Sequence, residues 1–109
     1  MIRRVELLAA LLLSCTVMAA GCGRAPAIGP DKEVFTTIDA LYTAVSMKDA
    51  GQLERNATSL NRFHEAGRLP DGAHEALAAI VFEAKGGEWE PARQKLRDFM
   101  LDQGPQRER

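Results

Sequence analysis

The sequence predicts an all-α protein: two antiparallel helical hairpins, or a small four-helix bundle, behind a leader that is removed. Three observations support this prediction. Apolar residues recur at helical spacing in four separate segments. Pro-Asp pairs precede two of these segments and glycines separate them, as expected at helix starts and ends. The chain also matches itself at an offset of 36, which pairs the four segments into two similar hairpins.

The segment 1–21 has the pattern of an export signal. Arg3 and Arg4 make a basic head, Leu7–Gly21 is an almost unbroken apolar run, and small residues close it. This order is typical of a signal peptide that is cleaved from the mature protein. A membrane-spanning helix is the less favoured alternative, because the run from Leu7 to Gly21 is shorter than the roughly 20 apolar residues that a span needs.

The run closes with Ala19-Ala20-Gly21-Cys22, which resembles the lipobox of bacterial lipoprotein signal peptides. The resemblance implies that Cys22 is the lipidated first residue of the mature chain. It also implies that the protein is exported and anchored to a membrane, on the periplasmic or cell-surface side. Ala19 departs from the pattern, since the family favours Leu there. Cleavage at Cys15 would leave a very short apolar run, so Cys22 is preferred; a simply cleaved, secreted product is the alternative.

The mature chain divides into a lipidated Cys with its tether, a helical domain and a polar tail, over residues 22–30, 31–103 and 104–109. The stretch after Cys22 contains two Pro and two Gly, lacks apolar periodicity and is expected to form a flexible tether. Fully extended, it spans roughly 26 Å, which would hold the domain clear of a membrane. No disulfide is expected, since Cys15 leaves with the leader and Cys22 takes the lipid.

Apolar spacing predicts helices over residues 31–48, 52–66, 71–85 and 88–103. Asp31 is a preferred N-cap, Gly67 a C-terminal cap and Gly86-Gly87 a helix break. Pro91 is tolerated because it falls in the first turn of the last helix. The residues expected to face the core are Val34, Ile38, Leu41, Val45, Leu53, Ala57, Leu60, Phe63, Ala73, Leu77, Ile80, Val81, Ala84, Ala92, Leu96, Phe99 and Met100.

The match at offset 36 aligns Leu41 with Leu77 and Gly51 with Gly87. Seven of the 25 positions from 39 to 63 are identical, where ordinary residue frequencies give roughly one or two. The expected unit is a helical hairpin with its break at Gly51 or Gly87. A two-helix unit of this length is similar to the tetratricopeptide family, and the resemblance implies a protein-interaction module. Shared amphipathic patterning without duplication is the alternative explanation.

The sequence has no recognisable catalytic or cofactor motif. His64 and His74 are the only histidines, and ten residues and a turn separate them, which does not suggest a metal site. The net charge of −1 gives no support for nucleic-acid binding. The expected function is that of a membrane-anchored lipoprotein with a helical protein-interaction module, not an enzyme, and without a cofactor. A self-associating structural lipoprotein is the second hypothesis, and an enzyme or ligand carrier the third.

A domain of about 70 residues is expected to be only marginally stable alone, at about 3.5–10 kcal/mol. Two hairpins are also fewer units than helical repeat arrays usually need to bury a continuous core. Because no further repeat follows the last helix, an open apolar face is expected along it. Trp89 and Phe99 are therefore the candidate partner-binding residues.

Overall fold

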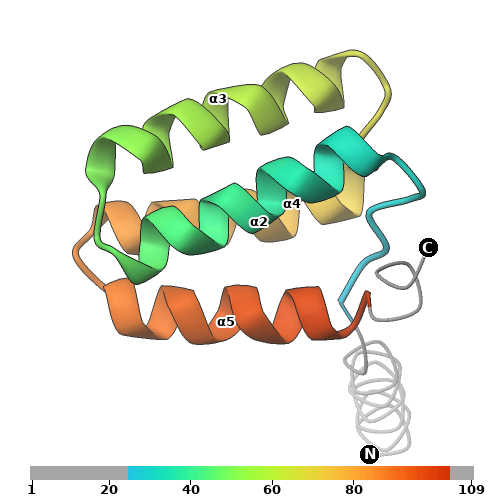
Figure 1. Ribbon diagram of the computed structural model, residues 1–109. Helices are drawn as coiled ribbons and strands as arrows, with labels where there is room; N and C mark the ends of the chain where they lie inside the picture. The colour runs from blue at the N-terminus through green and yellow to red at the C-terminus, as the bar shows by residue number, and fades with distance from the viewer. Residues whose placement is uncertain (1–24, 104–109) are drawn as a thin grey trace, which may run out of the picture.

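A computed structural model describes residues 25–103 of the chain as four α-helices joined by short turns (Figure 1). The helices are α2 (Lys32–Ser46), α3 (Ala50–Glu65), α4 (Asp71–Lys85) and α5 (Trp89–Leu101). These residues contain no strand, and the predicted all-α fold is confirmed. The predicted leader, Cys22 and the polar tail lie outside the described residues.

Aspartate side chains cap the N-termini of α2 and α3. The carboxylate of Asp31 accepts the backbone N–H groups of Glu33 and Val34, as expected for the predicted N-cap. Asp49 caps α3 in the same way, by accepting the N–H of Gln52. Both caps satisfy donors that have no partner within the helix, so they fix where α2 and α3 begin.

The three turns each contain one residue in the left-handed backbone region. Gly67 (φ 76°) and Gly87 (φ 87°) follow α3 and α4, as the sequence predicted. The turn between α2 and α3 uses Lys48 (φ 55°), a conformation that costs a residue with a Cβ atom about 1 kcal/mol. The predicted break at Gly51 is therefore wrong: the turn lies at residues 47–49, and Gly51 belongs to the first turn of α3.

The four helices form a closed antiparallel bundle. Helix α2 packs against α3 and α5, and α4 packs against the same two helices. The diagonal pairs, α2 with α4 and α3 with α5, barely touch. In Figure 1, α3 lies at the top and α5 at the bottom, with α2 in front of α4. The two predicted hairpins, α2–α3 and α4–α5, thus pair into a small four-helix bundle. Because α2 closes the ring, α5 has a neighbour on each side.

The predicted offset of 36 between the two hairpins is wrong, because the structure places it at 39. Helix α2 spans Lys32–Ser46 and α4 spans Asp71–Lys85, so both ends of the first helix are offset by 39 in the numbering. The second helices, which begin at Ala50 and Trp89, and the left-handed Lys48 and Gly87 have the same separation. At 3.6 residues per turn, a shift of three residues leaves an apolar stripe on nearly the same helix face. The apolar matches in the sequence therefore could not separate the two offsets.

The interior is one cluster of apolar side chains contributed by all four helices. Every residue predicted to face it is buried, except Ala57 and Phe63, which are half-buried and pack against it. Phe99 is 3% exposed, so the open face expected along α5 is absent at this residue. The reason is that α2 and α4 cover the helix that carries it. Trp89 is half-buried and packs against the same cluster.

Residues 25–30, which we call the N-terminal segment, are fixed to the end of the bundle beside α5 (Figure 1). Ile28 is 1% exposed and belongs to the core cluster. The buried Gln103 accepts the N–H of Ile28 at its Oε1 (3.2 Å) and donates from its Nε2 to the carbonyl of Pro26 (2.9 Å). One side-chain amide thus pairs two backbone groups, and without it the buried N–H of Ile28 would be left unsatisfied. The prediction of a flexible tether is wrong over these residues.

We expect Phe99→Ala to lower the free energy of unfolding by about 3–5 kcal/mol, because removing a buried ring leaves a cavity. Phe82→Ala is the matched control, since it removes the same atoms from a residue that is 80% exposed. Surface substitutions of that kind usually change stability by no more than about 0.5 kcal/mol. Urea unfolding followed by circular dichroism measures both variants, and equal losses would contradict the placement of Phe99 in the core.

Candidate functional site

The least closely packed boundary of the bundle lies between α3 and α4. Helix α3 buries only Leu53 and Leu60, whereas α4 buries five side chains. Most other residues of α3 are polar, and Asn56, Thr58 and Ser59 each donate to the carbonyl four residues earlier in the same helix. Helix α3 therefore packs mainly on α2 and leaves a hollow of about 240 Å³ against α4. We call this hollow the α3–α4 groove.

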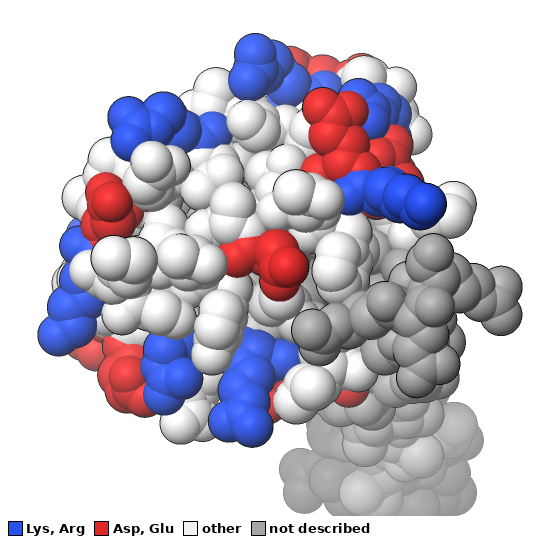
Figure 2. Space-filling view, in the orientation of Figure 1, with Lys and Arg blue, Asp and Glu red and all other residues white. Residues whose placement is uncertain are grey.

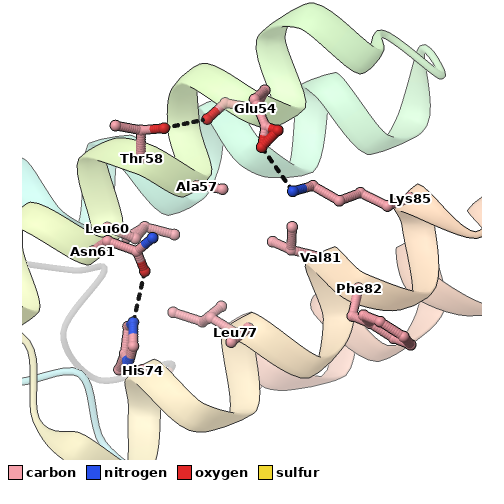
Figure 3. A pocket seen from close by; sticks show the side chains of 11 residues that line it. Glu54, Ala57, Thr58, Leu60, Asn61, His74, Leu77, Val81, Phe82 and Lys85 are labelled. Atoms are coloured by element: carbon pink, nitrogen blue, oxygen red, sulfur yellow. Dashed lines mark hydrogen bonds and ion pairs between the residues drawn. The ribbon is translucent and has the colours of Figure 1, made fainter.

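The α3–α4 groove has an apolar middle and a polar contact toward each end (Figure 3). Toward one end, the Lys85 ammonium lies 2.7 Å from the Glu54 carboxylate across the groove. Toward the other, His74 Nε2 lies 2.7 Å from Asn61 Oδ1. The apolar lining between these two contacts comes from Ala57, Leu60, Leu77, Ala78 and Val81. The two polar contacts connect α3 to α4 and frame the apolar hollow.

Phe82 lies at the edge of the groove and is 80% exposed, more than any other large apolar residue in the described part of the chain. Its ring extends outward from α4 (Figure 3). Burying an aromatic side chain removes roughly 150–250 Å² from water, so an exposed ring beside an apolar hollow favours association. The sequence analysis missed this residue. Its signal in the sequence is a large apolar side chain that falls outside the buried stripe of α4.

The two histidines, ten positions apart in the sequence, stack face to face where α3 ends and α4 begins. The ring centroids of His64 and His74 are 4.0 Å apart and the ring planes differ by 4°. His64 Nε2 also lies 2.7 Å from Asp71 Oδ1, just as His74 contacts Asn61. The histidines thus join the two helices at this end. Within residues 25–103, no three His, Cys, Asp or Glu side chains gather in a way that could hold a metal ion.

Arg68, in the turn between α3 and α4, connects that turn to the start of α2. Its guanidinium donates to Asp31 (2.8 and 3.0 Å) and to Glu33 (2.7 Å), and it lies 4.6 Å from the centre of the Phe63 ring. The hydrogen bond from Arg68, helped by the backbone N–H of Val34, holds the pKa of Asp31 below its ordinary value of 3.8. The two carboxylates in turn raise the pKa of the Arg68 guanidinium.

The predicted partner-binding residues do not form this site. Phe99 is in the core, Trp89 is half-buried against it, and neither lines the α3–α4 groove. On α5 the large apolar residue that is exposed is Leu101, and the most exposed one in residues 25–103 is Phe82 on α4. Cys22, the predicted lipid attachment point, lies outside the described residues.

Charged side chains of both signs are interspersed on the face of the molecule seen in Figure 2, with uncharged surface between them. None of the helices within residues 25–103 combines the length and the apolar character that crossing a membrane requires. No family model matches the chain, and neither the curated proteins nor the solved structures contain a match to it. The groove, with Phe82 at its edge, is therefore a candidate binding site on the basis of its geometry.

We expect Arg68→Ala to destabilise the domain more at neutral pH than in acid. The pKa of Asp31 is lowered in the folded state, so its pairing stabilises the fold fully above the ordinary pKa of 3.8. That stabilisation is lost as the pH falls through the lower, folded-state pKa. The difference in melting temperature between the parent protein and the variant should therefore be constant near neutrality and shrink below about pH 3.8.

Thermal melts across a pH series measure this difference. Arg62→Ala is the control, since it removes an exposed arginine that bonds to Ser59 within α3. A difference for Arg68→Ala that persists unchanged in strong acid would contradict the stabilising role of the Asp31 pair.

Proposed function

We propose that this protein is an exported lipoprotein, anchored to a membrane by lipid on Cys22, whose helical domain binds a protein partner. The anchor is supported by the leader, with its basic head, its apolar run and the small residues before Cys22. One buried acyl chain gives only marginal membrane binding, at about 0.8 kcal/mol per CH₂. Stable anchoring therefore takes more than one chain, as the lipoprotein resemblance implies.

The observation that carries the binding role is the α3–α4 groove with the exposed Phe82 on its edge. Its volume of about 240 Å³ is smaller than the roughly 300–1,000 Å³ of pockets that enclose drug-sized ligands. The charged residues of its lining, Glu54 and Lys85, neutralise each other. The groove therefore suits one or two uncharged apolar side chains. An amphipathic partner helix presents such side chains at i, i+3 and i+4, and we propose it as the occupant.

Self-association is the second candidate function, and Phe82 is again the observation that favours it. An exposed ring beside a hollow on one molecule can enter the hollow of a second copy. A standard stable interface buries about 800 Å² on each partner, however, which is more than this narrow groove offers. A partner helix that also contacts the groove edges is therefore preferred over a dimer held by the groove alone.

The anchor predicts a specific mass and location for the mature protein. Protein extracted from membranes should have the mass of residues 22–109 plus more than one acyl chain. Cys22→Ala should lose the added mass and leave the membrane fraction, because no other thiol remains after the leader is cleaved. Cys15→Ala is the control and should behave like the parent protein. An unmodified mature chain in the parent protein would refute the lipid attachment.

The binding role predicts a site-specific crosslink. A photoreactive amino acid in place of Phe82 should give one adduct heavier than the chain itself, when irradiated in cells. The same amino acid in place of Met47, which is 71% exposed but does not line the groove, is the control and should not give that adduct. Ala57→Leu, which places extra methyl groups in the groove, should abolish the adduct from position 82.

The mass of the adduct separates the two candidate functions. A product at twice the mass of the mature chain indicates self-association. A heavier or lighter product that survives Ala57→Leu would show that the crosslink does not depend on the groove, and the proposed binding site would then be wrong.

A further inference from the structure

The N-terminal segment is held to one end of the bundle along most of its length. The backbone N–H of Ala25 donates to the Asp102 carboxylate (3.1 Å), and Gln103 pairs with both Pro26 and Ile28. Ile28 inserts into the core with 1% of its surface exposed. The chain is therefore fixed from its first described residue onward, against the end of α5.

The start of α4 meets the same segment. A Cβ atom placed on Gly72 would lie 3.3 Å from Cβ of Pro26, so a side chain there would crowd the segment. The N-terminal segment therefore contacts α4 as well as α5 before the chain enters α2. It covers one end of the bundle, formed by the start of α2, the start of α4 and the last residues of α5 (Figure 1).

Cys22 precedes Ala25 by only three residues. Three extended residues span at most about 11 Å, compared with roughly 26 Å for the whole stretch that the sequence predicted to be a tether. A lipid on Cys22 therefore has almost no free chain between itself and the folded domain.

We infer that the end of the bundle covered by the N-terminal segment faces a lipid surface directly, which rests on the proposed lipid attachment at Cys22. The opposite end, with the turns at residues 47–49 and 86–88, points away from that surface. Helix α2 has 15 residues and is thus about 22 Å long, which sets the distance between the two ends. The segment acts as a rigid attachment that orients the domain.

The charges at the covered end are compatible with lipid headgroups. The carboxylates of Asp31 and Glu33 are paired with Arg68, and Asp71 contacts His64. Asp102 accepts the N–H of Ala25. These acidic groups are therefore engaged within the protein, which reduces their repulsion of anionic headgroups.

This orientation leaves the α3–α4 groove accessible. Helix α3 is diagonal to α5, and the residues that hold the N-terminal segment, Asp102 and Gln103, directly follow α5. With the bundle standing on its covered end, the groove runs along the side of the bundle, with the Asn61–His74 contact toward the membrane and the Glu54–Lys85 contact away from it. An anchored domain can therefore present Phe82 to a partner without moving relative to its attachment.

Fluorophores at the two ends of the bundle test the inference. The full chain is expressed with Leu101→Cys or Met47→Cys, and the lipidated mature protein is purified from membranes and placed in phosphatidylcholine vesicles that carry a headgroup-attached spin quencher. Leu101 and Met47 are 55% and 71% exposed, so both thiols are available for labelling. Their positions place Leu101 beside the N-terminal segment and Met47 at the opposite end.

The label at position 101 should lose most of its fluorescence to the surface quencher, and the label at position 47 should lose little. A long flexible Gly-Ser insertion between Gly23 and Arg24 should remove this difference, because the domain can then tumble. Equal quenching of the two labels without the insertion would overturn the inference while leaving the lipid anchor intact. A difference in quenching that survives the insertion would also overturn the inference. Failure of the uninserted protein to remain on the vesicles would instead overturn the lipid anchor itself, and the inference with it.

Discussion

Packing of α5 against α2 closes the ring of helices, and the burial of the apolar side chains of the last helix depends on it. The contact covers Phe99 and brings the end of α5 beside the start of α2, where Gln103 reaches the backbone of Ile28. A hydrogen bond from Arg93 to the hydroxyl of Tyr42 (3.3 Å) spans the same boundary. Residues 25–103 contain no cysteine, so burial of apolar surface is the main source of their stability.

The ring is closed but not uniform. Helices α2, α4 and α5 each bury four or five side chains, whereas α3 buries only Leu53 and Leu60. A helix with few buried contacts is held less firmly, and such elements are the ones that usually move or bind. The groove beside α3 is therefore a direct result of how the apolar residues are divided among the helices. The core remains intact at the other three helices while this boundary stays open.

Local sequence was enough to predict the elements but not how they meet. Caps and 3.6-residue spacing act over a few residues, so Asp31, Gly67 and the buried stripes were recognised. Phe99 was placed among the core-facing residues and was also named a partner-binding candidate, because chain order does not reveal that α2 closes the ring. Ile28 is a single apolar residue in a Pro- and Gly-rich stretch, and its burial depends on Gln103, 75 residues away. The α3–α4 groove depends on spacing between helices, which no local pattern encodes.

The bonds that hold the N-terminal segment join positions 75 and 77 residues apart. Contacts at such separation carry a large loop-closure cost and form late in folding. Until α5 is complete and packed, the residues before α2 have no Gln103 to bind. Under the lipid attachment proposed at Cys22, folding would thus be coupled to distance: an unfinished domain would be joined to the lipid through an unpaired N-terminal segment, and only the finished domain would lie close to the bilayer. Proteases that act away from the membrane surface would therefore reach incomplete copies more easily than native ones.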